Sequence, residues 1–374
     1  MSPINAMRLG AIARKEAIQL RRDPRSLILA FLLPVALLIL FGYAITWDID
    51  DIPLAVVDCD HSARSRELVG AFLASGYFSL VARPDRAADL GGDLDRGRIQ
   101  LGLVIPVGFA ADLDAGRAAP LQAIVDGSDA NTATIILAYS EAIVRCYSAQ
   151  ILLHGVQPLA LVTAQSRVWY NEELTSRNMI VPGLVAVIMM IIAAMLTSLT
   201  IAREWERGTM EQLAATPASR LEIVLGKLLP YLIIGLIDVV ACSFLGVLLF
   251  GVPFRGSPLL MFILSFFFLC GVLGLGMFIS AVAKSQLLAT QMAMVATFLP
   301  AYLLSGFMFA IDVMPTVLRG ITFIVPARYF LVVTRGLFLK GVGINVLFLQ
   351  GLLMIAFAAI GFFLAVRVFR KELA

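Results

Sequence analysis

The sequence predicts a polytopic α-helical membrane protein with six transmembrane helices and an α/β extracytoplasmic domain inserted between spans one and two. Of its 374 residues, 60% are hydrophobic and only 15% are charged, whereas a soluble globular chain is about 45–50% apolar. Several apolar runs exceed the roughly 20 residues that cross a bilayer. One polar segment, residues 48–177, separates the first of these runs from the others. The formal net charge of +3 is small and predicts no nucleic-acid partner.

Residues 1–25 are predicted to form a cytoplasmic amphipathic helix on the surface of the lipid bilayer. Basic residues there outnumber Glu16 and Asp23, and apolar residues recur at helical spacing. A simple positive-inside anchor is the alternative, and both interpretations place the N-terminus in the cytoplasm. The apolar run Leu27–Trp47 is too long for the core of a signal peptide, and no A-x-A site ends it. We therefore expect residues 26–47 to be a permanent first transmembrane helix.

Residues 48–177 are predicted to form the α/β domain. The segment carries 17 acidic and 10 basic residues, which contrasts with the basic N-terminal arm and places it opposite the cytoplasm. Helices are expected after Ser62, over residues 85–97 and over residues 129–153. Short apolar runs predict four strands, at Leu54–Asp58, Phe78–Ala82, Leu101–Ile105 and Leu121–Val125.

Several reactive side chains occur in this domain. Asp58, Asp60 and His61 follow the first strand, where such residues form a turn and a helix cap more often than a catalytic or metal site. Cys59 and Cys146 could form a disulfide if the domain faces an oxidising compartment, although neither their spacing nor their context demands it. No Cys/His cluster has the spacing of metal ligands, so no bound metal is expected.

Residues 178–374 are predicted to form a five-helix transmembrane domain. Residues 311–343 are apolar but interrupted by prolines and basic residues, so we expect a re-entrant segment on the outer side. Arg367, Arg370 and Lys371 place the C-terminus in the cytoplasm. The five spans are expected at Met179–Ile201, Leu228–Phe250, Leu259–Val282, Leu287–Ala310 and Ile344–Phe369.

A polar stretch, residues 203–227, lies between two of these spans and carries four positive and four negative charges. Charges at this density between two spans are expected in water or against another protein. Gly208 and Thr209 can end one helix and cap the next, and a short helix is expected to close at Thr216-Pro217. A loop that only fixes topology would favour Lys and Arg; the balanced charges here favour docking of a soluble protein.

The run E-x-E-R-G-T-x-E-x-L-x-x-T-P, followed by E-x-x-x-G-K, resembles the cytoplasmic loop of type 2 ABC-transporter permeases. The phrases VVDCDHSARS, VWYNEEL and IVPARYFLVVTRGLFLKG resemble drug-exporting members of that family, so the resemblance extends over nearly the whole chain. It implies that the coupling loop, residues 203–220, docks on a separate ATP-binding-cassette ATPase. The positions that match the loop are Glu204, Glu206, Arg207, Gly208, Thr209, Glu211, Thr216 and Pro217.

The resemblance also implies partners and a location. A second permease copy or a paralogue would complete the pore in a bacterial inner membrane, with both termini cytoplasmic. A periplasmic membrane-fusion adaptor is a further candidate partner. ATP and Mg²⁺ would bind to the ATPase subunit. A drug or another amphipathic molecule is the expected substrate, while lipid, polysaccharide and ion export stay open.

No cofactor or ATPase site is expected on this chain. Gly226-Lys227 is followed by leucine and lacks the upstream glycine of a P-loop. Asp238 is the one carboxylate well inside a predicted span, about 16 Å beyond Lys227 along a helix. It could line the substrate path or carry a proton, or it could be protonated and hydrogen-bonded to a neighbouring helix.

Two other functions stay open on the sequence alone. An ATP-independent membrane scaffold or sensor would act through its outer domain. A proton-driven carrier would need more intramembrane charge than Asp238 supplies and an inverted repeat, which the spans do not show.

Overall fold

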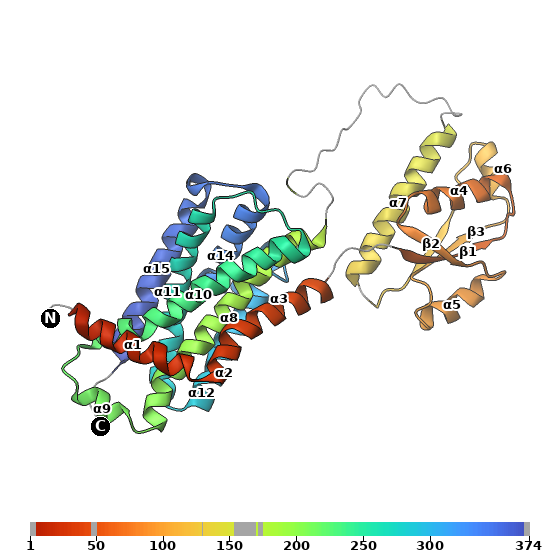
Figure 1. Ribbon diagram of the computed structural model, residues 1–374. Coiled ribbons are helices and arrows are strands. Elements are labelled where there is room, and N and C mark those ends of the chain that lie inside the picture. The colour runs from red at the N-terminus through yellow and green to blue at the C-terminus, as the bar shows by residue number, and fades with distance from the viewer. Residues whose placement is uncertain (1–4, 46–50, 129, 153–169, 171–174, 370–374) are drawn as a thin grey trace. The chain divides into compact units, whose positions relative to one another are not determined.

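The computed structural model describes residues 5–45, 51–128, 130–152, 170 and 175–369 (Figure 1). The chain divides into two compact units. One comprises residues 47–166 and the other comprises residues 1–46 together with 167–374. The first is an α/β unit and the second is helical.

The α/β unit is built on a four-stranded sheet with the order β2-β1-β3-β4. The central strand β1 pairs in parallel with β2 and β3, and β4 runs antiparallel to β3. All four predicted strands are confirmed, with bounds Ile52–Asp58 (β1), Phe78–Ala82 (β2), Leu101–Ile105 (β3) and Gln122–Val125 (β4). The helices are α4 (Ala63–Ala74), α5 (Ala87–Asp95), α6 (Phe109–Asp114), which the sequence did not predict, and α7 (Ala130–Leu152).

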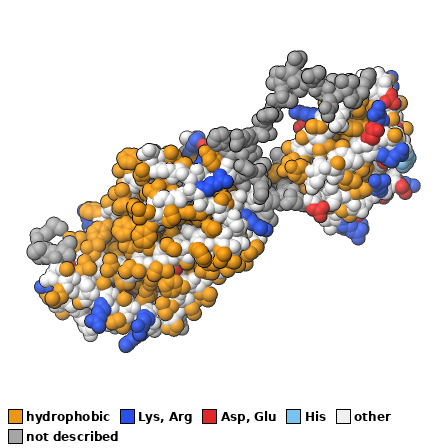
Figure 2. Space-filling view, turned by 45° about the horizontal axis from the view of Figure 1, so that its top comes forward, with side chains coloured by type: hydrophobic (Ala, Val, Ile, Leu, Met, Phe, Trp, Pro, Cys, Tyr) orange, Lys and Arg blue, Asp and Glu red, His pale blue; other side chains and the backbone are white. Residues whose placement is uncertain are grey.

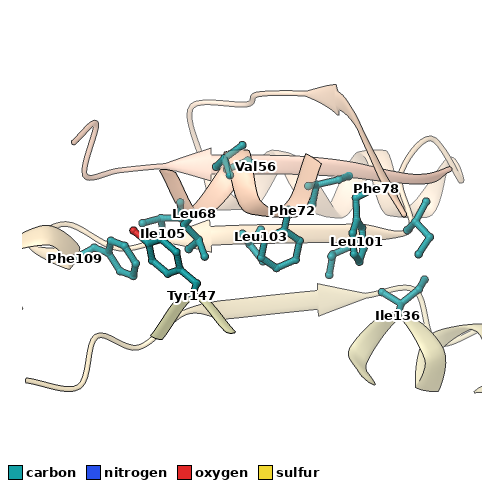
Figure 3. Packing of buried hydrophobic residues seen from close by; sticks show 13 residues of the cluster. Val56, Leu68, Phe72, Phe78, Leu101, Leu103, Ile105, Phe109, Ile136 and Tyr147 are labelled. Atoms are coloured by element: carbon teal, nitrogen blue, oxygen red, sulfur yellow. The ribbon is translucent and has the colours of Figure 1, made fainter. Parts of the chain in front are cut away.

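Both faces of the sheet are covered. On one face Val56 packs with Phe72 of α4 and Tyr147 of α7 (Figure 3). On the other face Val57 packs with Leu90 of α5. Successive residues of a strand point to opposite faces, so burial on both sides explains the unbroken apolar run of β1.

The turn after β1 confirms the turn-and-cap interpretation of its acidic residues. The Asp58 carboxylate accepts hydrogen bonds from the amides of Asp60 and His61 and from the Ser65 hydroxyl. Asp60 accepts from the amides of Gly108, in the loop after β3, and of Ala110, at the start of α6, and its hydrogen bond with Ser62 is the main cause that lowers its pKa. The disulfide that the sequence left open is not formed, because Cys59 and Cys146 are both free, exposed thiols.

The helical unit begins with α1 (Ala6–Arg21), followed by a continuous helical stretch made of α2 (Pro24–Leu27), a π-helical turn (Ile28–Leu32) and α3 (Leu33–Ala44). Next come α8 (Ser176–Glu206), α9 (Met210–Ala215), α10 (Arg220–Phe250) and α11 (Pro258–Ala283). The unit ends with α12 (Gln286–Leu299, extended by a π-helical turn Pro300–Leu304), α13 (Thr316–Ile321), α14 (Pro326–Arg335, extended to Lys340) and α15 (Ile344–Val368).

Five helices in the described part of the chain are long and apolar enough to cross a membrane: α8, α10, α11, α12 with its π-helical turn, and α15. Nearly all of the apolar stretch of α8 is buried by its neighbours, whereas the outer faces of α10 and α15 expose Phe244, Leu248 and Phe348. Figure 2 shows hydrophobic side chains over much of the visible face of this unit. The protein is therefore a polytopic helical membrane protein.

Several predicted boundaries differ from the structure. The helix predicted to end at Ala310 stops at Leu304, before a turn in which Gly306 has a φ of 86°. The helix predicted to end at Ile201 continues to Glu206 because its charged residues find partners within the chain. The first predicted span is represented by the shorter apolar helix Ile28–Ala44; Thr46 and Trp47 lie outside the described residues.

Candidate functional site

The short helix predicted in the polar loop is confirmed as α9. Gly208, with a φ of 67°, ends α8, and Thr216 is extended at the end of α9. Ser219 then caps α10, since its hydroxyl accepts from the Glu222 amide and the Glu222 carboxylate accepts from the Ser219 amide at 2.7 Å. The expected side-chain cap at Thr209 is not formed, because the Thr209 hydroxyl donates to the Glu204 carboxylate instead.

Helix α9 has one buried and one exposed side. Met210 and Leu213 are only 4% and 9% exposed and anchor the helix to its own unit. We call the exposed residues of this corner the α9 surface. It consists of Arg207, Gly208, Glu211, Gln212, Ala215, Thr216, Pro217 and Arg220.

The N-terminal helix α1 lies against the corner between α9 and α10 (Figure 1). The Arg8 guanidinium donates to the Pro217 carbonyl at 2.8 Å, and the Asn5 amide donates to Glu222. A Cβ atom at Gly226 of α10 would lie 2.8 Å from the side chain of Ile12 of α1. The glycine therefore allows α1 and α10 to approach each other this closely.

Beneath this contact are four charged side chains and one tyrosine that we call the buried ionic cluster: Lys15, Glu16, Glu204, Lys227 and Tyr231. The Lys227 ammonium lies 3.0 Å from Glu16 and 3.1 Å from Glu204, and all three side chains are nearly inaccessible. Glu204 is also 2.7 Å from the half-exposed Lys15. The Tyr231 hydroxyl donates to Glu16 at 3.0 Å. Two carboxylates thus face two ammonium groups, and no buried charge of this cluster is left uncompensated.

Two further contacts fix the end of α8. The Arg203 guanidinium lies 3.0 Å from the Asp23 carboxylate and donates to the Ser26 hydroxyl, which connects α8 to the start of α2. The Glu206 carboxylate accepts from the amide of Gln286 at 2.7 Å and from its side chain. The end of α8 is therefore joined to α1, α2, α10 and α12.

The expectation that the charges of residues 203–227 lie in water or against another protein is wrong for four of them. Arg203, Glu204, Glu222 and Lys227 are at most 6% exposed and have partners within this chain. Glu204 is consequently placed to hold the loop, not to touch a docking protein. Glu206, Arg207, Gly208, Glu211, Thr216 and Pro217 are exposed, and Thr209 is half-buried.

Sequence reasoning missed the partners of these charges, namely Lys15, Glu16, Asp23, Lys227 and Tyr231. One signal was available. Glu16 stands between Ala13 and Leu20, at helical spacing on the buried face of α1. An acidic residue on the apolar face of an amphipathic helix indicates a buried cationic partner.

Asp238 is 4% exposed and lies on a stripe of α10 that faces other helices of the unit. On the same stripe, Gly235 is packed against Leu269 of α11 and Gly246 against Val181 of α8. Asp238 makes no hydrogen bond or ion pair with any other residue that the structure describes. Among these residues, Asp238 therefore has no partner for the hydrogen bond to a neighbouring helix that was the alternative interpretation.

Comparisons with known proteins agree with this architecture. The family model described as "ABC-2 family transporter protein" matches residues 24–367. Among curated proteins of Escherichia coli K12, the chain is 40% identical over 349 residues to "Probable multidrug ABC transporter permease YbhS", covering 91% of this chain and 92% of that protein. It is 31% identical to "Probable multidrug ABC transporter permease YbhR", with the same coverage. It is 27% identical to "Inner membrane transport permease YhhJ", covering 86% of each chain.

The family match spans the α/β unit and most of the helical unit, including α9, and it begins after α1. The chain therefore belongs to the ABC-2 family of transporter proteins, as a permease.

Proposed function

We propose that this chain is the permease subunit of a bacterial ABC exporter and that a separate ATP-binding-cassette ATPase docks on the α9 surface. The observation that carries the proposal is the contrast between the two sides of α9. One side is exposed, and the other is anchored by the buried side chains of Met210 and Leu213. The Thr209 hydroxyl at the start of α9 donates to Glu204, and Glu204 belongs to the compensated buried ion pairs that join α1, α8 and α10. Separating such pairs costs several kcal/mol, so a push on α9 would move these helices together.

The first span in this proposal is the continuous stretch from Pro24 to Ala44. At 1.5 Å per residue it is roughly 30 Å long, which matches the hydrocarbon core. Its start lies beside the end of α8, because Asp23 and Ser26 both contact Arg203. Its end lies beside the last residue of α10, since the rings of Tyr43 and Phe250 have centroids 4.8 Å apart. The stretch thus extends alongside α10, from the end of the helical unit that carries α9 to the opposite end.

The segment after α12 is re-entrant in this proposal. Thr316–Ile324 and Pro326–Lys340 are bent by 82°. Arg335 donates to the carbonyls of Gly306 and Met179, and Met179 lies near the start of α8. The Leu337 carbonyl accepts from the Gly256 amide, in the turn after α10. The second arm therefore lies at the end opposite to α9. A re-entrant segment at that end leaves six spans and both termini on the cytoplasmic side.

The remaining parts of the proposal concern partners and substrate. A second copy of this chain or a paralogue would complete the pore, and a periplasmic membrane-fusion adaptor would contact the α/β unit. ATP and Mg²⁺ would bind to the ATPase subunit. Two relatives are named multidrug permeases, which supports a drug or another amphipathic molecule as substrate. The scaffold alternative loses support, because the relatives that share most of their length with this chain are named permeases.

Charge reversal on the α9 surface tests the docking site. Glu211→Lys should lower ATP-driven export of an amphipathic cation such as ethidium by about tenfold or more, since like charges at an interface cost several kcal/mol. Membrane insertion should be unchanged, because Glu211 is exposed. Glu141→Lys is the matched control, an exposed charge reversal in the α/β unit. Equal export by the parent, the control and Glu211→Lys would show that the ATPase docks elsewhere.

The proposed role of Asp238 is to line the substrate path and attract a cationic substrate. Asp238→Asn keeps the shape of the side chain and removes its charge. It should lower export of ethidium severalfold, leave export of a neutral amphipathic substrate nearly unchanged, and leave ATP hydrolysis and protein level intact. Equal export of both substrate classes by parent and variant would contradict a role in the path.

A further inference from the structure

The α/β unit contains a cavity of about 580 Å³ that the proposed transport function does not use. Its apolar wall is formed by Val56 of β1 and by Val69 and Leu73 of α4. Its polar wall comes from two loops, with Cys59 and His61 after β1 and Arg83 and Asp85 after β2, and from Arg66 of α4. Cavities of this volume accommodate small organic molecules.

The topology of the sheet explains why a cavity forms here. After β1 the chain passes to α4, which packs on one face of the sheet, and after β2 it passes to α5, which packs on the other face. Since β1 and β2 are parallel neighbours, their two loops diverge at the carboxyl ends of the strands. Ligands of open α/β sheets bind in crevices outside the carboxyl ends of the strands.

The charged groups of the cavity favour an anion. Arg66 donates to the His61 carbonyl at 3.0 Å, and neither Arg66 nor Arg83 forms an ion pair with another residue in the described part of the chain. The Asp58 carboxylate is occupied by the Ser65 hydroxyl and two backbone amides. Asp85 is exposed at the rim, as are Arg66 and Arg83. Two guanidinium groups without carboxylate partners thus stand beside an apolar wall, an arrangement that suits bidentate binding of an oxyanion.

The cavity is also preformed. Asp60 accepts from the amides of Gly108 and Ala110 at 2.8 and 3.1 Å, so the loop after β1 is bound to the loop after β3 and to the start of α6. His61 adopts a left-handed conformation with a φ of 53°. This conformation is held by the hydrogen bond that the His61 amide donates to the Asp58 carboxylate. A fixed wall lowers the entropy cost of binding a ligand.

We propose that this cavity binds a small amphipathic organic anion, with its carboxylate, sulfonate or phosphate group on Arg66 and Arg83 and its apolar body against Val69 and Leu73. The site belongs to the α/β unit alone. It does not depend on the α9 surface or on Asp238, so it can be tested whether or not the chain is an exporter.

The exposed thiol of Cys59 provides a reporter inside the cavity, and the exposed thiol of Cys146 on α7 provides a reference outside it. The full chain in lipid nanodiscs would be treated with an anionic and a cationic methanethiosulfonate, and labelling of each cysteine followed by mass spectrometry. We expect Cys59 to prefer the anionic reagent severalfold more strongly than Cys146 does. Octanoate should slow labelling of Cys59 by the anionic reagent, whereas octylammonium and acetate should not.

Variants separate binding from general electrostatics. Arg66→Gln with Arg83→Gln should abolish both the preference for the anionic reagent and the protection by octanoate. The charge-matched control is Arg98→Gln with Arg117→Gln, which removes two arginines that pair with Asp93 and Asp112 outside the cavity. The control should behave like the parent. The proposal would be overturned if octanoate did not protect Cys59 in the parent. It would also be overturned if the Arg98/Arg117 control lost this protection as fully as the Arg66/Arg83 variant. Intact protection in the Arg66/Arg83 variant would overturn the assignment of the anion to these arginines.

Discussion

At the scale of single residues, the charged side chains of the polar loop form two groups, one exposed to a partner and one buried within the helical unit. Glu211 and Arg207 are exposed and available to a partner. Glu204 and Lys227 are buried and face α1. A buried ion pair is weak evidence for stability, since its desolvation offsets its attraction, but removing one partner leaves a charge uncompensated. The buried ionic cluster therefore specifies how α1, α8 and α10 meet.

This division predicts an asymmetric response to mutation. Lys227→Met should destabilise the helical unit by about 3–5 kcal/mol, because it leaves Glu16 without its ammonium partner and Glu204 with only Lys15. Adding Glu16→Gln and Glu204→Gln should recover most of that loss, because no buried charge then remains in the buried ionic cluster. The measurement is chemical denaturation of the purified protein followed by tryptophan fluorescence.

Arg145→Met serves as the control, since its pair with Glu141 is exposed and should contribute about 0–1 kcal/mol. If the triple variant were no more stable than Lys227→Met alone, charge compensation would not be what the cluster provides.

At the scale of elements, α1 acts as a clamp across the corner between α9 and α10. The clamp depends on close approach at Gly226, where an added methyl group would meet Ile12 and, at 3.1 Å, the backbone carbonyl of Leu9. Backbone cannot move aside as a flexible side chain can. The position of α1 is therefore sensitive to one glycine that lies on α10.

Gly226→Val should displace α1 and expose it to protease, with cleavage in residues 8–22 at least tenfold faster than in the parent. Export should fall as well, because the displaced helix no longer supports α9. Gly10→Val is the matched control, since a Cβ at Gly10 has nothing within 4 Å. Cleavage at the parental rate in Gly226→Val would show that α1 does not need this contact. The measurement is limited trypsin digestion of the protein in nanodiscs.

At the scale of the whole molecule, periodicity and composition were sufficient for most of the secondary structure, α6 excepted. The runs at β1 and β3 were visible because both faces of these strands are buried, and α8, α10, α11 and α15 were visible because lipid and neighbouring helices both require apolar residues. The short helix α9 followed from Gly208 and Thr216, whose backbone conformations end regular helix.

What the sequence could not predict are contacts between residues far apart in the chain. Glu16 and Lys227 are separated by 211 positions, and no local pattern reveals that they meet. Thr209 looked like a cap because its type and position fit one, but a buried carboxylate at Glu204 is a stronger acceptor. The end of α12 at Leu304 was missed because the following residues are as apolar as the helix itself.

The central claim is that this permease is driven by a separate ATPase held at the α9 surface, and co-purification tests it most directly. The tagged chain would be extracted gently from membranes in which its genomic neighbours are also expressed, and the complex assayed for subunit stoichiometry and ATP hydrolysis. The account predicts a stoichiometric ATPase subunit that is retained with Glu141→Lys and lost with Glu211→Lys. Purification of the parent chain without an ATPase, or an ATPase retained equally by all three proteins, would contradict it.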